Sequence, residues 1–157
     1  MKYLKNELFE GVISKREYVH LYLNDLIDKE GVVLISISEP DVEPFLSEMV
    51  EGFVDVLHSQ FWDVEQPIED KYYPLSPEQG KELRAFIELH KDKRFLIHCA
   101  AGMSRSAAIA AAVECIVNYD GNTYSYKTGV SGLSEFRRYF PNPTVFKEIM
   151  DGHLPRN

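Results

Sequence analysis

The chain has 157 residues, and its 45% apolar and 27% charged content is that of an ordinary globular domain rather than a disordered or fibrous chain. The net charge of −8 disfavours nucleic acid and anionic membranes as partners, because an acidic surface repels polyanions. No apolar run approaches the roughly 18 residues of a membrane span, and the N-terminus lacks the apolar core of a secretory signal. From this length we expect one domain over 1–157. The two cysteines do not form a disulfide framework, so we expect the reducing cytoplasm as its location.

The first half of the chain alternates between strand and helix patterns. Short β-branched or apolar runs predict strands, and a Ser-x-x-Glu capping box marks the start of a helix. The predicted elements are, in order, a strand over 9–13, a helix from Ser14–Glu17 to about residue 28, a central strand over 32–37, a short helix over 45–51 and a strand over 53–62.

The second half continues the alternation after a long aperiodic segment. Loops of this length inside a compact domain are usually functional. The predicted elements are the loop over 63–76, a helix from the capping box Ser76–Gln79, a strand over 95–97, an alanine-rich helix over 104–118, a segment of uncertain structure over 119–132 and a final helix over 145–150. This order predicts an α/β fold with a central, mostly parallel and possibly mixed sheet flanked by helices.

One stretch between a strand and a helix has the features of an anion site. A loop that leads into a helix N-terminus presents free backbone N–H groups, and the helix dipole favours an anion there. Cys99 begins this loop as a candidate nucleophile, and the planar guanidinium of Arg105 can bind two oxygens of a phosphate. The same surroundings favour the thiolate form of a cysteine. The residues expected to bind the anion are Ala100, Ala101, Gly102, Met103, Ser104 and Arg105.

The string His-Cys-Ala-Ala-Gly-Met-Ser-Arg-Ser over 98–106 resembles the Cys-x5-Arg signature of cysteine-dependent protein phosphatases, and most of all the dual-specificity branch. The resemblance implies a protein-tyrosine-phosphatase-like fold and metal-independent hydrolysis of phosphomonoesters through a cysteinyl-phosphate, without a cofactor. It implies a phosphorylated protein or a small phosphoester as substrate. The loop lacks the lysines typical of branches that act on inositol lipids and the Gly-Arg-Thr-Gly ending of the tyrosine-specific branch.

The resemblance also implies roles for three residues around the loop. Ser106 is expected to donate a hydrogen bond to the sulfur of Cys99 and ease its departure from phosphorus. His98 is expected to order the loop through hydrogen bonds. Asn142, between two prolines, resembles an asparagine that helps to hold the phosphate loop.

A general acid is needed because an alkoxide is a poor leaving group. Asp63 is the first choice, since it follows a predicted strand at the sheet edge where Cys99 lies and opens the long loop. It precedes Cys99 by 36 residues, which resembles the family's spacing, although Phe61-Trp62-Asp63-Val64 replaces the Trp-Pro-Asp of the tyrosine-specific enzymes. The other acidic residues of the loop stay open as alternatives, namely Glu65, Glu69 and Asp70.

Two other functions remain open from the sequence. One is a non-catalytic module that binds phosphorylated sites on the same fold, and the other is a sulfurtransferase or arsenate reductase, which also uses a cysteine in an anion-binding loop. The five histidines show no ligand spacing with the cysteines, so a zinc site is not expected. Cys115 lies in the middle of a predicted apolar helix and is interpreted as a packing residue.

Overall fold

The computed structural model describes residues 2–44, 48–118, 133 and 136–151. Four strands form one sheet in the order β1-β4-β2-β3, and every strand pairs in parallel with its neighbours. The strands are β1 (Phe9–Ser14), β2 (Val32–Ser38), β3 (Asp55–Gln60) and β4 (Arg94–Cys99), and the helices are α1 (Lys15–Leu23), α2 (Pro77–Leu89), α3 (Arg105–Val117) and α5 (Pro143–Met150). The prediction of an α/β fold around a parallel sheet is confirmed.

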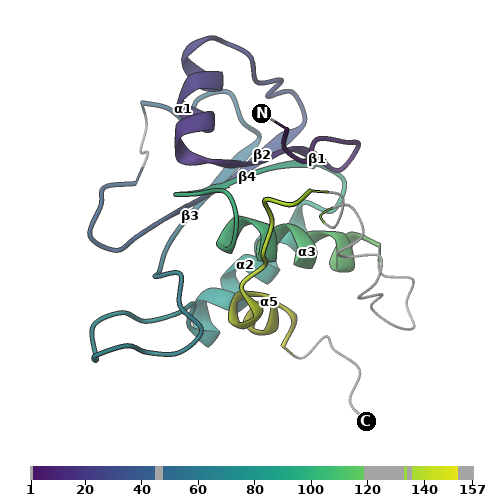
Figure 1. Cartoon of the computed structure of the whole chain (residues 1–157). Coiled ribbons are helices and arrows are strands. Elements are labelled where there is room, and N and C mark those ends of the chain that lie inside the picture. The colour runs from purple at the N-terminus through teal and green to yellow at the C-terminus, as the bar shows by residue number, and fades with distance from the viewer. Residues whose placement is uncertain (1, 45–47, 119–132, 134–135, 152–157) are drawn as a thin grey trace.

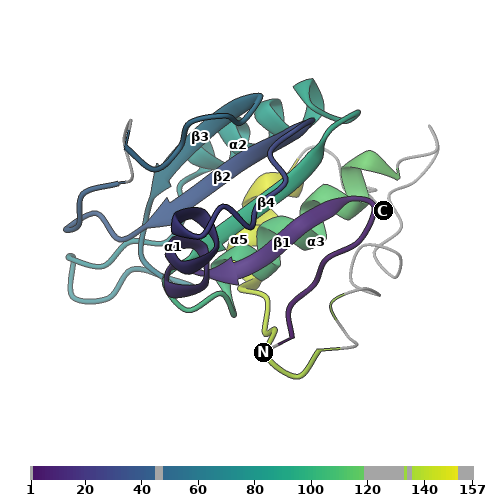
Figure 2. The same ribbon diagram turned by 90° about the horizontal axis from the view of Figure 1, so that it is seen from above.

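The helices cover the two faces of the sheet unequally. Helix α1 lies on one face, and α2, α3 and α5 lie together on the other, as two views at right angles show (Figures 1 and 2). The larger apolar cluster fills the space between the sheet and these three helices, and the smaller one lies under α1 around Tyr18 and Leu34. None of the described helices is long and apolar enough to cross a membrane.

Helix α3 is the buried centre of the larger layer. Its residues Arg105 to Ile116 are all buried, and six of its thirteen positions hold only alanine or serine. Small side chains allow a helix to approach its neighbours closely, and a helix without a polar face is stable only inside a core. The alanine-rich sequence therefore places α3 against both the sheet and α5.

Several predicted boundaries differ from the structure. Helix α1 starts at the predicted capping box but ends at Leu23 rather than near residue 28, because Asp25 has a positive φ of 53° that an α-helix cannot contain. The strand predicted over 53–62 covers only Asp55–Gln60. Of the helix predicted over 45–51, the described residues 48–51 are not helical and 45–47 lie outside the described residues, as does the segment 119–132.

The segment before α5 returns to the N-terminal part of the chain. The hydroxyl of Tyr139 donates to the carbonyl of Val12 at 2.6 Å and accepts from the N–H of Leu4 at 2.8 Å. The guanidinium of Arg138 donates to both carboxylate oxygens of Glu17 at 3.0 and 2.6 Å. The segment before α5 is thus joined to the N-terminal part of the chain beside β1.

Candidate active site

The loop predicted to bind an anion lies at the carboxyl end of β4 and leads directly into α3. Gly102 adopts a positive φ of 67°, which favours glycine. A Cβ at this position would also collide with the backbone of Ile13 and Ser14, where β1 joins α1. Gly102 therefore allows the loop to pack directly on the end of the neighbouring strand.

The carbonyl groups of the loop are held by neighbouring elements. Ala100 accepts from the N–H of Lys15 at 3.2 Å, Met103 accepts from Phe140 at 2.8 Å, and Ser104 accepts from Asn142 at 3.2 Å. When the carbonyls of a compact loop point outward, its N–H groups are left on the inner side, as in the backbone nests that bind anions. These contacts fix the loop on three sides.

The start of α3 differs from those of the other helices. The N-cap side chains of α1, α2 and α5 accept hydrogen bonds from N–H groups of the first turn, whereas the side chain of Ser104, the N-cap of α3, makes no such bond. The first N–H groups of α3 are therefore not capped by this serine. A helix start of this kind can bind an anion.

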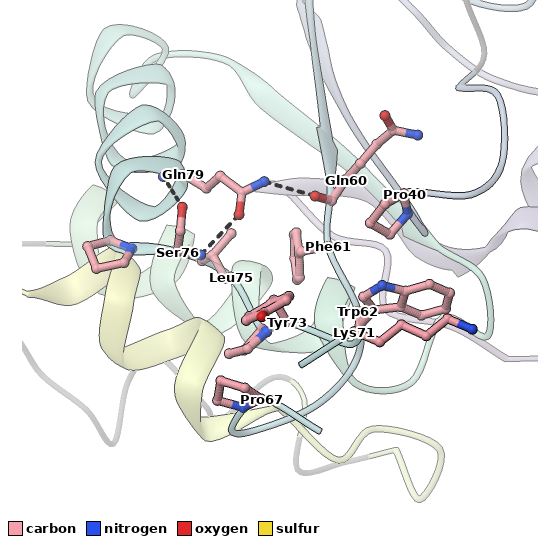
Figure 3. A pocket seen from close by; sticks show the side chains of 12 residues that line it. Pro40, Gln60, Phe61, Trp62, Pro67, Lys71, Tyr73, Leu75, Ser76 and Gln79 are labelled. Atoms are coloured by element: carbon pink, nitrogen blue, oxygen red, sulfur yellow. Dashed lines mark hydrogen bonds between the residues drawn. The ribbon is translucent and has the colours of Figure 1, made fainter. Parts of the chain in front are cut away.

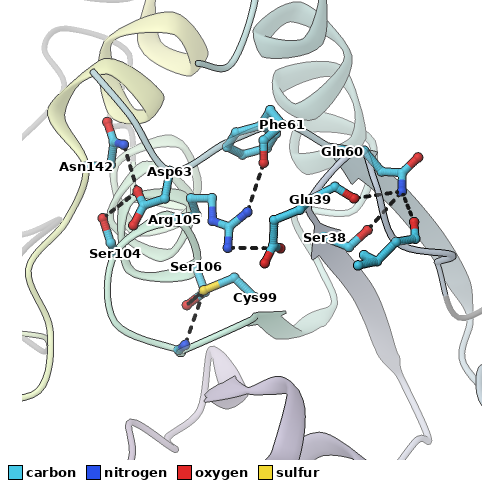
Figure 4. Close-up of polar contacts among 12 residues, drawn as sticks. Ser38, Glu39, Gln60, Phe61, Asp63, Cys99, Ser104, Arg105, Ser106 and Asn142 are labelled. Carbon is cyan, nitrogen blue, oxygen red and sulfur yellow. Dashed lines mark hydrogen bonds and ion pairs between the residues drawn. The ribbon is translucent and has the colours of Figure 1, made fainter. Parts of the chain in front are cut away.

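The sulfur of Cys99 lies beneath this helix start (Figure 4). The residue is 2% exposed, and its Sγ accepts from the N–H of Gly102 at 3.2 Å and lies 3.2 Å from the Oγ of Ser106. Two polar groups thus converge on one sulfur, and both can donate to a thiolate. The structure brings Cys99, Gly102 and Ser106 together as the sequence predicts.

The guanidinium of Arg105 is held by two residues that follow strands at this edge of the sheet, Phe61 after β3 and Glu39 after β2. Its Nη1 donates to the carbonyl of Phe61 at 2.9 Å, and its Nη2 lies 3.3 Å from Oε2 of Glu39. Among the described residues, the buried Nε of Arg105 has no hydrogen-bond partner. Glu39 was not predicted from the sequence, although it directly follows β2 at the same carboxyl edge as Cys99, and this placement is the signal that identifies it.

Asp63 faces the helix start from the loop that follows β3 (Figure 4). Its Oδ1 accepts from the Oγ of Ser104 and from the Nδ2 of Asn142, both at 2.9 Å. The same Nδ2 donates to the carbonyl of Val64 at 3.2 Å, and the hydroxyl of Thr144 donates to the carbonyl of Glu65 at 2.7 Å. Residues 63–65 are therefore tied to both α3 and the start of α5.

Asn142 connects the loop and the acidic residue. Its backbone N–H donates to the Ser104 carbonyl, its amide nitrogen donates to Asp63, and its amide oxygen accepts from the first turn of α5. One buried asparagine thus contacts the anion loop as expected and, in addition, holds the carboxylate, a contact that the sequence did not predict.

The alternative acidic residues lie elsewhere on the loop. Glu69 and Asp70 are exposed, have positive φ values of 55° and 50°, and form the turn at the tip of the loop. Glu65 lines a surface depression of about 300 Å³ that also contains Asp63 and Ser104. Among the described residues, Asp63 is the only one of these acids whose carboxylate accepts a hydrogen bond from the anion loop.

His98 lies below the loop on β4 and is 1% exposed. Its Nε2 is 2.7 Å from the Oγ of Ser36 on β2, and its ring stacks on Tyr18 at a centroid distance of 4.9 Å. Burial lowers the pKa of His98 to about 4, so the imidazole is neutral at pH 7. A neutral, packed ring fits the expected ordering role and not proton transfer at neutral pH.

Cys115 is a different kind of cysteine. It is 1% exposed in the middle of α3, and burial together with the nearby Glu114 raises the pKa of its thiol to about 11. A thiol in this state is protonated and weakly reactive at neutral pH. Its placement agrees with the predicted packing role.

No family model matches the sequence, and no curated protein matches it. Solved structures match the fold. Human DUSP28 aligns with a TM-score of 0.56 and 18% identity over 96% of this chain and 93% of that chain. Tk-PTP in the active form aligns with a TM-score of 0.52 and 22% identity over 89% of this chain and 85% of that chain.

A third structure, the human tyrosine phosphatase-like serine/threonine/tyrosine-interacting protein, aligns with a TM-score of 0.52 and 19% identity over 92% of this chain and 87% of that chain. In all three cases the alignment covers most of both chains. The chain therefore has the fold of the tyrosine and dual-specificity phosphatases.

Proposed function

We propose that the protein is a phosphatase that hydrolyses phosphomonoesters of tyrosine and of serine or threonine in proteins through a cysteinyl-phosphate. One observation carries the proposal. The Cys99 sulfur, the Arg105 guanidinium and the Asp63 carboxylate converge at the uncapped start of α3, although Asp63 comes from a distant part of the chain. A nucleophile, an anion-binding cation and an acid are the three groups that this chemistry requires.

In the first step, the Cys99 thiolate attacks phosphorus, and the bond between phosphorus and the substrate oxygen breaks. The loop N–H groups and Arg105 bind the non-bridging oxygens, whose charge they stabilise in the transition state. The substrate oxygen takes a proton from Asp63 as it leaves. Because Oδ1 of Asp63 is held by Ser104 and Asn142, the other oxygen, Oδ2, is the one that we assign to proton transfer.

In the second step, Asp63 accepts a proton from water while the water oxygen attacks phosphorus. The bond between phosphorus and sulfur breaks, and inorganic phosphate and the Cys99 thiolate are released. The hydroxyl of Ser106, 3.2 Å from Sγ, donates a hydrogen bond to the departing thiolate. Each group is thereby returned to its starting state without a metal or an added cofactor.

The test is hydrolysis of para-nitrophenyl phosphate in the presence of EDTA. We expect turnover that vanadate inhibits and that Cys99→Ser abolishes, because a serine hydroxyl is not ionised at neutral pH. Cys115→Ala is the matched control, since it removes the other thiol of the chain and leaves the loop unchanged. Circular dichroism of each variant confirms that the fold is retained.

Unchanged turnover in Cys99→Ser would contradict the proposal. The alternative of a non-catalytic binding module predicts another result, namely a parent protein that binds a phosphopeptide without hydrolysing it. Transfer of sulfur from thiosulfate, or reduction of arsenate, in place of phosphate ester hydrolysis would support the third function that the sequence left open.

A further inference from the structure

A second concave site of about 520 Å³ lies beside the candidate active site (Figure 3). Its volume falls in the range of pockets that bind small molecules or single side chains. Its walls are formed by the loop after β2, the end of β3, the loop over 67–75 and the start of α2. Apolar and aromatic side chains dominate the lining, among them Pro40, Phe61, Trp62, Tyr73 and Leu75.

The walls are held together by hydrogen bonds. The side-chain amide of Gln60 donates to the carbonyl of Val42 at 2.7 Å, which ties the loop that carries Pro40 to β3. Gln79 of α2 donates to the carbonyl of Gln60 at 2.8 Å, and the N–H of Trp62 donates to the carbonyl of Tyr73 at 3.0 Å. The pocket is therefore preformed, and a ligand would not have to order its walls.

Residues 61–63 connect this pocket to the candidate active site. The Phe61 side chain lines the pocket, while its carbonyl accepts from Arg105 at 2.9 Å. Trp62 also lines the pocket, and the next residue is Asp63. A group bound in the pocket would thus contact two residues that directly precede the proposed acid.

The charges around the pocket favour one kind of occupant. Among the described residues that line it, Lys71 alone carries a charge. A single lysine at an apolar pocket, with no carboxylate among its described lining residues, favours an apolar group that has an acidic group beside it.

Resting on the proposed function, we infer that this pocket binds an apolar side chain of the phosphorylated protein that is flanked by an acidic residue and lies a few residues from the phosphorylated one in sequence. An extended chain advances about 3.3 Å per residue. Phe61 lines the pocket with its side chain and binds Arg105 of the anion loop with its carbonyl, so the two sites are neighbours. The bound side chain therefore lies roughly two to four residues from the phosphorylated one.

The test compares synthetic phosphopeptides that differ at one position. A leucine or tryptophan is moved through the positions on either side of the phosphorylated residue in a glycine and serine background, with and without an adjacent glutamate. At the matching position we expect kcat/KM to rise about tenfold over the glycine peptide, because burying one apolar side chain is worth that much.

Two variants locate the effect in the pocket. Tyr73→Ala removes part of an exposed wall and should abolish the gain from the apolar side chain, whereas Lys71→Glu should abolish or reverse the gain from the glutamate. Lys81→Glu is the matched control, since it makes the same charge change on an exposed position of α2 outside the pocket. Hydrolysis of para-nitrophenyl phosphate should stay unchanged in all three variants, which also shows that each is folded.

Equal kcat/KM for all peptides, with active enzyme, would overturn the inference while leaving the proposed function intact. A gain that survives in Tyr73→Ala would also overturn it, as would a dependence on the acyl chain of a phospholipid in place of the peptide side chain. If the parent lacks turnover, the proposed function fails, and binding of the same peptides with a non-hydrolysable phosphonate still tests the pocket.

Discussion

The two carboxylate oxygens of Asp63 have unequal surroundings. Oδ1 accepts from Ser104 and Asn142, whereas Oδ2 has no hydrogen-bond partner among the described residues. Two fixed donors on one oxygen orient the carboxyl group and direct the other oxygen outward. An exposed acid on a loop is thereby held in one position relative to the sulfur of Cys99.

Replacement of Asp63 by asparagine should slow hydrolysis by an amount that depends on the leaving group. We expect kcat to fall about 10²-fold or more for an alkyl phosphate such as phosphoserine, and less for para-nitrophenyl phosphate, whose phenolate leaves without a proton. The measurement is kcat for both substrates in the parent and in Asp63→Asn.

Glu69→Gln is the matched control, because it removes a carboxylate at the tip of the same loop. We expect this variant to retain the parent's kcat for both substrates. Undiminished activity in Asp63→Asn, with loss in Glu69→Gln, would assign the acid to the loop tip.

At the scale of elements, α3 serves two purposes with one sequence. Its first turn faces the anion loop, and its remaining turns pack inside the core. Glu114 is the exception to the apolar composition, since it is 6% exposed and its Oε1 lacks a hydrogen-bond partner among the described residues. Burial raises the pKa of Glu114 to about 7. This carboxyl group therefore makes the stability of α3 dependent on pH.

The sign of this dependence follows from proton binding. Between the ordinary pKa of 4.5 and the raised value near 7, the folded state binds more protons at Glu114 than the unfolded state does. This group therefore stabilises the fold as pH falls through that window, and its charged form destabilises the fold above about pH 7. We expect Glu114→Gln to raise the free energy of unfolding by about 2 kcal/mol at pH 8 and by much less at pH 4.5.

Urea denaturation at both pH values measures this difference. Glu82→Gln on the exposed side of α2 is the control, and it should show no such dependence. An equal effect of Glu114→Gln at the two pH values would show that the carboxyl group does not titrate in this range.

Much of the fold and the anion loop could be predicted because the signals are local. The capping boxes at Ser14 and Ser76 mark helix starts, and the string around Cys99 contains the proposed nucleophile, the cation and the hydroxyl within a few residues. Contacts that join distant segments have no such signal. The pairing of Glu39 with Arg105, and the hold of Asn142 on Asp63, depend on how loops meet at the carboxyl edge of the sheet.

At the scale of the whole molecule, the segment before α5 ties the C-terminal part of the chain to β1 and α1. Tyr139 provides the buried part of this connection through its hydroxyl, and Arg138 provides the outer part through Glu17. The same segment continues into Asn142, which holds Asp63. The stability of this connection and the geometry of the acid are therefore coupled through a few consecutive residues.

Replacement of Tyr139 by phenylalanine should destabilise the fold by about 1–3 kcal/mol, because it leaves a buried carbonyl at Val12 and a buried N–H at Leu4 without their partner. The measurement is the free energy of unfolding in urea. Tyr73→Phe, which removes the hydroxyl of a half-exposed tyrosine, should change it little. A similarly small change in Tyr139→Phe would show that other groups satisfy both backbone atoms.

The tight contact of Gly102 with the backbone of Ile13 and Ser14 shows that packing constrains one residue of this loop independently of any activity. Any related protein that keeps this fold needs a glycine at position 102, because a larger side chain would collide with the backbone of Ile13 and Ser14. Cys99 and Asp63, in contrast, can be replaced by residues of similar size with little harm to packing. If the proposed hydrolysis is lost in a related protein, we therefore expect the glycine to persist after the sulfur and the carboxylate are gone. The pair Cys99 and Asp63, and not the glycine, is what would distinguish active from inactive members.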